Sequence, residues 1–135
     1  MKSKKILVWL PVVFCLVIIF FFSSQTGDES LATSGLFAFL MKFGLTATAI
    51  RKLAHFTEFA ALGFFTFTAF KVNFKNKGLP AVPALVALYA VSDEIHQLFV
   101  PGRACTFVDI CIDTAGGVAG IAISVLLLSV CFKQK

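Results

Sequence analysis

Long runs of apolar residues, separated by short polar segments, dominate this sequence. Four runs stand out, at residues 6–22, 53–70, 79–100 and 107–132. Each is close to the roughly 17–25 residues that an α-helix needs to cross about 30 Å of hydrocarbon. The pattern therefore predicts an all-α, polytopic membrane protein, a bundle of four transmembrane helices that forms a single domain over residues 1–135.

The longest connection between the runs, residues 23–50, holds a second and weaker pattern. Apolar residues recur there at helix-like spacing, at Leu36, Phe37, Phe39, Leu40 and Phe43. This spacing favours either a short helix at the membrane interface or an ordinary amphipathic segment that packs on the bundle.

The composition supports a lipid environment. Hydrophobic residues make up 59% of the chain and charged residues only 14%, whereas charged residues are about 25% of soluble domains. The 17 phenylalanines would leave a soluble surface short of polar cover. We therefore exclude a soluble globular protein and a nucleic-acid-binding tail, and expect membrane lipid, not nucleic acid, as a partner.

The distribution of lysines predicts the orientation. Most of the 12 basic residues precede the first run, separate the second from the third, or follow the fourth: Lys2, Lys4, Lys5, Lys71, Lys75, Lys77, Lys133 and Lys135. The positive-inside rule then places both termini and residues 71–77 in the cytoplasm. We expect the first run to be a retained span, because residues 22–25 lack the small-x-small pattern of a signal-peptide cleavage site.

Polar residues cluster at the start of the second predicted span, at the end of the third and at the start of the fourth. An ionisable group at membrane depth is costly unless it is paired or hydrated. In the predicted topology these groups lie at the outer ends of their helices, which favours a hydrated pocket in the outer leaflet. The expected lining is Arg51, His55, Glu58, Asp93, Glu94, His96, Gln97, Arg103, Asp109 and Asp113.

Helical spacing supports this grouping. Arg51, His55 and Glu58 follow one another at i, i+4 and i+7, so they share one helix face. Asp109 and Asp113 are also i, i+4 neighbours on the fourth span. A structural alternative remains open, in which the arginines only neutralise carboxylates and hold the bundle together.

Several of these polar residues could also bind a metal ion. His55, Glu58, Glu94, His96, Asp109 and Asp113 are all groups that bind divalent ions, but their spacing is not diagnostic and the two nearby arginines disfavour a cation. We therefore expect neither a metal nor another cofactor.

Four motifs, taken together, resemble a known family. They are SSQTGDES, RKLAHFTEFAALG, DEIHQLFVPGR and VDICIDTAGGVAG, and their order and spacing are similar to those of the VanZ-like family of small bacterial membrane proteins. The family's characteristic polar residues match Ser24, Gln25, Arg51, Lys52, His55, Glu58, Asp93, Glu94, Gln97, Arg103 and Asp109. The family commonly has asparagine where this chain has Asp113, and tyrosine where it has Phe59.

The resemblance implies a multi-pass protein of the bacterial cytoplasmic membrane. The founding member is associated with resistance to the glycopeptide teicoplanin, which favours a non-enzymatic envelope protein whose pocket binds a lipid-linked cell-wall intermediate. One alternative is an intramembrane enzyme that acts on a lipid-linked substrate, with His55 or Glu58 as catalytic general base. Another is a small transporter subunit, and a homo-oligomer is compatible with all three.

Overall fold

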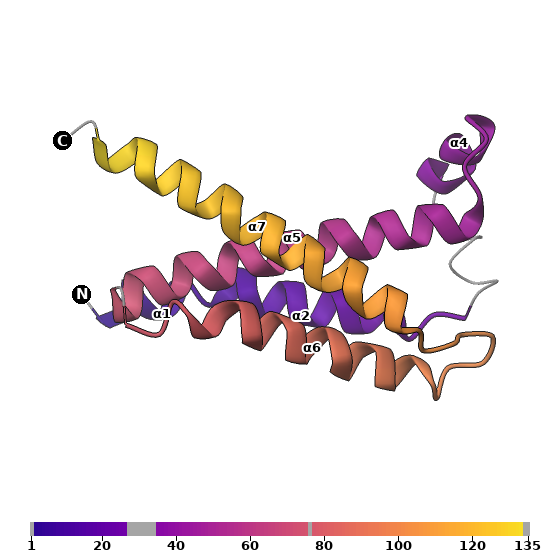
Figure 1. Ribbon diagram of the computed structural model, residues 1–135, viewed down its shortest axis with the longest axis horizontal. Helices are drawn as coiled ribbons and strands as arrows, with labels where there is room; N and C mark the ends of the chain where they lie inside the picture. The colour runs from indigo at the N-terminus through magenta and orange to yellow at the C-terminus, as the bar shows by residue number, and fades with distance from the viewer. Residues whose placement is uncertain (1, 27–34, 76, 134–135) are drawn as a thin grey trace.

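The chain folds into α-helices, as the hydropathy pattern predicts. The computed structural model describes residues 2–26, 35–75 and 77–133, and no strand occurs among them. The helices are α1 (Lys2–Leu7), α2 (Leu10–Ser23), α4 (Gly35–Lys42), α5 (Ala47–Phe74), α6 (Ala81–Gln97) and α7 (Phe107–Lys133) (Figure 1). The all-α fold class is therefore confirmed, and the helix-like spacing in the first long connection corresponds to α4.

The first predicted span contains a break. Helices α1 and α2 are separated by Val8 and Trp9, although Lys5–Ser23 is one apolar segment. Pro11 lies in the first turn of α2 and has no N–H to continue the hydrogen-bond ladder of a preceding helix. The Trp9 amide instead donates to the Ile6 carbonyl over 3.0 Å, which closes a tight turn between the two helices.

Within the described residues, three segments are long and apolar enough to cross a membrane, namely Lys5–Ser23, Ala47–Phe74 and Phe107–Val130. Helix α6 is shorter, with 17 residues, or about 25 Å at 1.5 Å per residue. It ends before residue 100 because Pro101 disfavours helical geometry in the residue before it, and Gly102 then turns the chain with a φ of +75°. The expected span at residues 79–100 is thus a helix of Ala81–Gln97, and a fourth crossing stays a prediction.

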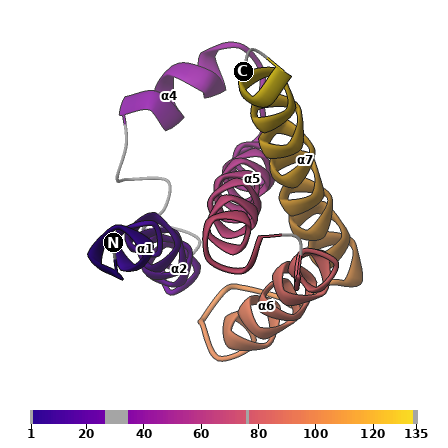
Figure 2. The same cartoon turned by 90° about the vertical axis from the view of Figure 1, so that its left-hand side faces the viewer.

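Helix α5 is the centre of the bundle. It packs against α2, α6 and α7, and the view along the bundle shows it between them (Figure 2). The core that these helices share includes Ile19, Phe59, Val82 and Ala90, which are all fully buried. Burial of one such large apolar side chain stabilises the fold by about 1.5–3 kcal/mol.

The closest helix crossing is between α5 and α7, because glycines lie at the contact. A methyl group at Gly116 would overlap the backbone carbonyl of Phe56, and one at Gly120 would overlap that of Ala60. Small residues at such positions let two helix backbones approach closely in a membrane. This crossing fixes the start of α7 beside the start of α5, where the polar residues lie.

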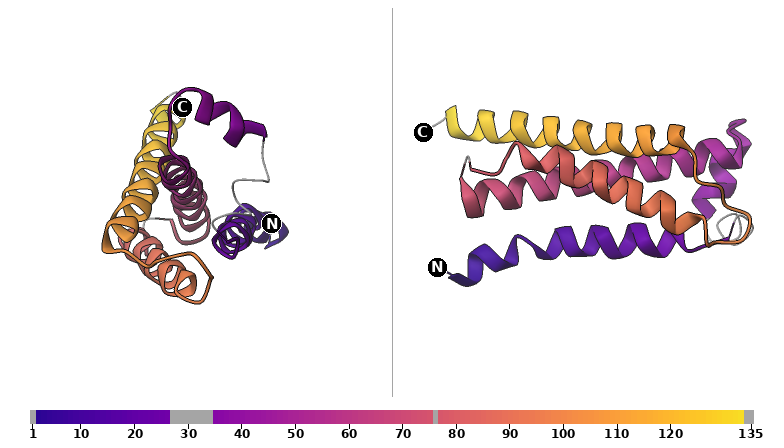
Figure 3. Two further views of the ribbon diagram at one scale, coloured as in Figure 1. Left: turned by 90° about the vertical axis from the view of Figure 1, so that its right-hand side faces the viewer. Right: turned by 60° about the horizontal axis from the view of Figure 1, so that its bottom comes forward.

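The first helix and the end of the last helix lie at the same end of the bundle. Helix α1 and the last turns of α7 are at the same end of the bundle as the turn between α5 and α6 (Figure 3). The Asn73 side chain at the end of α5 donates to the Lys5 carbonyl over 3.2 Å. The lysine-rich segments that the positive-inside rule assigns to one side are therefore on one side of the bundle.

Candidate functional site

A cavity of about 290 Å³ lies at the opposite end of the bundle from α1 and the turn between α5 and α6. It is formed where α5 begins, α6 ends and α7 begins. Its lining is Thr48, Arg51, Lys52, His55, Glu94, Gln97, Gly102, Arg103, Ala104, Thr106, Asp109, Ile112 and Asp113. Most of the site residues expected from the sequence are in this list, while Glu58 and Asp93 lie beside His55 outside the lining.

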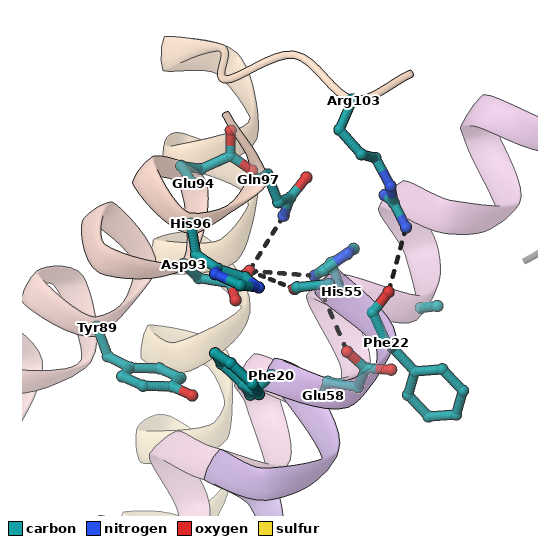
Figure 4. Close-up of polar contacts among 12 residues, drawn as sticks. Phe20, Phe22, His55, Glu58, Tyr89, Asp93, Glu94, His96, Gln97 and Arg103 are labelled. Carbon is teal, nitrogen blue, oxygen red and sulfur yellow. Dashed lines mark hydrogen bonds and ion pairs between the residues drawn. The ribbon is translucent and has the colours of Figure 1, made fainter. Parts of the chain in front are cut away.

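His55 is the centre of a buried polar cluster next to the cavity. Its Nδ1 atom lies 3.9 Å from Glu58 Oε2 and 3.9 Å from Asp93 Oδ2. Figure 4 shows the imidazole between the two carboxylates, one on the next turn of α5 and the other on α6. The i, i+3 spacing on α5 brings His55 and Glu58 together, whereas Asp93 is brought to them by helix packing.

Asp93 has two hydrogen-bond donors of its own. The Ser23 hydroxyl donates to Asp93 Oδ2 over 2.7 Å, and the Gln97 amide donates to the same oxygen over 3.1 Å. Ser23 is fully buried and Asp93 is 3% exposed. Ser23 is not among the residues predicted from the sequence, where the family resemblance points to Ser24 instead. Both serines follow an apolar span, and the sequence alone does not show which of them faces the interior of the bundle.

Residues at the start of α7 tie three helices together. Thr106 caps α7, since its hydroxyl oxygen accepts the Asp109 amide over 3.1 Å, a typical N-cap contact. The Thr106 amide donates to Glu94 Oε2 of α6 over 3.0 Å, and Lys52 of α5 donates to the Asp109 carboxylate as an ion pair. Glu94 and Asp109 therefore hold the mouth of the cavity in shape.

Arg103 joins the loop between α6 and α7 to the end of α2. Its Nε donates to the Gln25 carbonyl over 3.0 Å and its Nη2 to the Phe22 carbonyl over 3.2 Å (Figure 4). A cation near the C-terminal carbonyls of a helix is favourable. Burial, and after it the nearby Arg51, lowers the pKa of Arg103 below its usual range.

The two arginines do not pair with the buried carboxylates. Neither Arg51 nor Arg103 lies within 4.0 Å of a carboxylate among the described residues, whereas Lys52 contacts Asp109. The structural alternative, in which Arg51 and Arg103 neutralise Glu58, Asp93 and Asp109, is therefore not realised as direct ion pairs among the described residues.

His96 does not belong to the cavity. Its ring stacks on Phe20 with centroids 4.4 Å apart, and its Nε2 lies 3.0 Å from the Ser24 hydroxyl. These contacts place it on the side of α6 that faces α2, so its expected place in the lining is wrong. Asp93 and Gln97, which share its helix, turn toward the interior instead.

The cavity combines groups of both signs. Arg51, Lys52 and Arg103 supply positive charge, and Glu94, Asp109 and Asp113 supply carboxylates. Guanidinium groups bind phosphate oxygens in a two-pronged geometry, while carboxylates and the Gln97 amide accept hydroxyl or amide protons. The lining is thus suited to a ligand that carries both a phosphate and neutral polar groups.

The fold and the cavity define a class: a small helical membrane protein with a polar cavity at one end of its bundle. The family model VanZ/LLP1 matches residues 8–128. The chain therefore belongs to the VanZ/LLP1 family, as its motifs indicate. No curated protein and no solved structure matches the chain.

Proposed function

We propose that this protein lowers the susceptibility of a bacterium to lipid-associated glycopeptides such as teicoplanin. In this proposal the cavity faces the outer leaflet of the cytoplasmic membrane and binds the phosphate of a lipid-linked cell-wall intermediate. The observation that carries the proposal is the cavity itself, which has three cationic side chains in its lining beside the membrane-spanning helices.

Arg51 is the side chain best placed to bind the phosphate. It lines the cavity and is only partly buried, and it has no ion-pair partner in the part of the chain that the structure describes. The other two cations are engaged, Lys52 by Asp109 and Arg103 by the carbonyls at the end of α2. Arg51 therefore offers its guanidinium to a ligand without breaking an existing contact.

The orientation follows from the lysines at the other end of the bundle. Lys71 is in the last turn of α5, and Lys75 and Lys77 follow it in the turn to α6. The positive-inside rule assigns this end to the cytoplasm. The cavity then opens toward the outer leaflet, where lipid-linked wall intermediates meet glycopeptides.

The proposal is tested in a strain that lacks the gene and is complemented with single variants. We expect Arg51→Gln to lose protection against teicoplanin, and Arg51→Lys to retain only part of it because an ammonium keeps the charge but not the two-pronged geometry. Lys77→Gln is the matched control, since it removes an exposed cation at the opposite end of the bundle.

Membrane abundance of each variant is measured beside susceptibility. The proposal expects near-normal abundance for Arg51→Gln, because that side chain has no ion-pair partner among the described residues. If deletion of the gene leaves teicoplanin susceptibility unaltered, the resistance function is wrong. If abundance falls in parallel with protection, Arg51 has a structural role and the phosphate site is wrong.

A further inference from the structure

Three side chains from three helices converge below the cavity. His55 of α5, Asp93 of α6 and Asp113 of α7 each place one nitrogen or oxygen atom within 4.8 Å of the other two. None of the three is a neighbour of another in sequence. Their approach is a product of helix packing, above all of the glycine contact between α5 and α7.

Several buried polar atoms in and beside this cluster have no hydrogen-bond partner among the described residues. Asp113 is only 2% exposed, and its Oδ2 atom, His55 Nδ1 and Glu58 Oε2 are all buried without a hydrogen bond from any described residue. A buried polar atom without a partner is costly, by about 1–3 kcal/mol each. Three such atoms in one small region indicate that a ligand supplies the missing interactions.

We propose that His55, Asp93 and Asp113 bind a divalent first-row transition-metal ion, next to Glu58, whose Oε2 atom lies 3.9 Å from His55 Nδ1. One imidazole nitrogen and several carboxylate oxygens suit Zn²⁺ or Mn²⁺. Three ligand atoms about 2.1 Å from one ion lie roughly 3.4 Å apart in tetrahedral geometry. Atoms within the 4.8 Å limit of the cluster therefore reach this spacing when the side chains approach one another by up to about 1.4 Å.

The surroundings of the cluster fit a cation. Two nearby arginines disfavour a cation on sequence grounds, yet the guanidinium of Arg103 is directed to the carbonyls of Phe22 and Gln25. Ser23 and Gln97 donate to the Asp93 carboxylate, and hydrogen bonds of this kind orient metal ligands. A bound divalent ion would also offset the excess of acidic groups over basic groups around His55.

The ion has a route to its site through the cavity. His55 and Asp113 line the cavity, while Asp93 and Glu58 lie behind His55. The metal site is a property of the chain alone and goes beyond the proposed glycopeptide function. Its test does not depend on any antibiotic phenotype, so the two proposals succeed or fail separately.

The test uses the full-length protein, purified in detergent through an affinity tag without histidines. After chelator treatment and removal of the chelator, the protein is titrated with ZnCl₂ and with MnCl₂, and bound metal is counted by mass spectrometry of the desalted sample. We expect one ion per chain and a higher unfolding temperature with metal, because a ligand that binds only the folded state stabilises it.

Single variants locate the site. Asp113→Asn and His55→Gln should each weaken binding by about tenfold or more, since each removes a direct ligand. His96→Gln is the matched control, because the only other histidine of the chain stacks on Phe20 outside the cluster. Asp109→Asn is the carboxylate control, as Asp109 lines the cavity but pairs with Lys52.

The wild-type titration decides the proposal even if a variant does not fold. Absence of stoichiometric binding to the wild-type protein overturns it. Equal binding by Asp113→Asn, by His55→Gln and by the wild type also overturns it, because the ion is then held elsewhere.

Discussion

Replacement of Ser23 by alanine should destabilise the protein well beyond what an exposed serine does. The Ser23 hydroxyl is fully buried and donates to Asp93 Oδ2 over 2.7 Å. A hydrogen bond to a charged group contributes about 1.5–3 kcal/mol, and its loss leaves only the Gln97 amide on that oxygen. We therefore expect Ser23→Ala to lower the free energy of unfolding by about 1.5–3 kcal/mol.

The neighbouring serine is an internal control. Ser24 is exposed, and its hydroxyl donates to the Phe20 carbonyl of its own helix over 2.7 Å and lies 3.0 Å from His96 Nε2. An ordinary hydrogen bond contributes about 0.5–1.5 kcal/mol, so Ser24→Ala should cost less than Ser23→Ala. The free energy of unfolding is measured for both variants by SDS titration of the detergent-solubilised protein. If Ser24→Ala costs as much as Ser23→Ala, or if neither changes stability, the buried contact to Asp93 does not hold α2 against α6.

Two further predictions concern packing and orientation. Gly120→Ala should lower the free energy of unfolding by about 1–3 kcal/mol, although alanine is the better helix former, because the added methyl carbon would lie 2.7 Å from the Ala60 carbonyl carbon. Ala122→Val, on the exposed side of α7, is the control. A Gly120→Ala protein that is as stable as the wild type would contradict the close contact between α5 and α7. In a cysteine-free background, a membrane-impermeant thiol reagent added to intact cells should label a cysteine at Ala104 but reach one at Lys77 only after the membrane is broken, and the reverse pattern would contradict the orientation.

Hydropathy predicted the helices well because lipid-crossing segments must be long and apolar. Two of the expected spans, residues 6–22 and 107–132, agree closely with Lys5–Ser23 and Phe107–Val130. The break at Val8 and Trp9 and the early end of α6 are local effects of Pro11 and Pro101, which a window of hydropathy averages away. The position of α4 relative to a membrane surface stays a prediction.

The site was partly visible in the sequence because helical periodicity places Arg51, His55 and Glu58 on one face. Contacts between helices were not visible. The hydrogen bond of Ser23 to Asp93 joins residues 70 positions apart, and only the rotation of α2 decides that Ser23 faces inward while Ser24 does not. In the same way, the orientation of α6 about its own axis turns His96 toward Phe20 and Ser24 of α2 and away from the cavity.

Binding of undecaprenyl phosphate to the purified protein tests phosphate recognition in the cavity most directly. Native mass spectrometry in detergent compares undecaprenyl phosphate with undecaprenol, which has the same chain but no phosphate. We predict that the protein forms a one-to-one adduct with undecaprenyl phosphate and binds undecaprenol much more weakly. The affinity for undecaprenyl phosphate should fall roughly 10- to 100-fold in Arg51→Gln but not in Lys77→Gln, because a charge-assisted hydrogen bond contributes about 1.5–3 kcal/mol. Equal binding of the two lipids, or undiminished binding by Arg51→Gln, would contradict a phosphate site in this cavity.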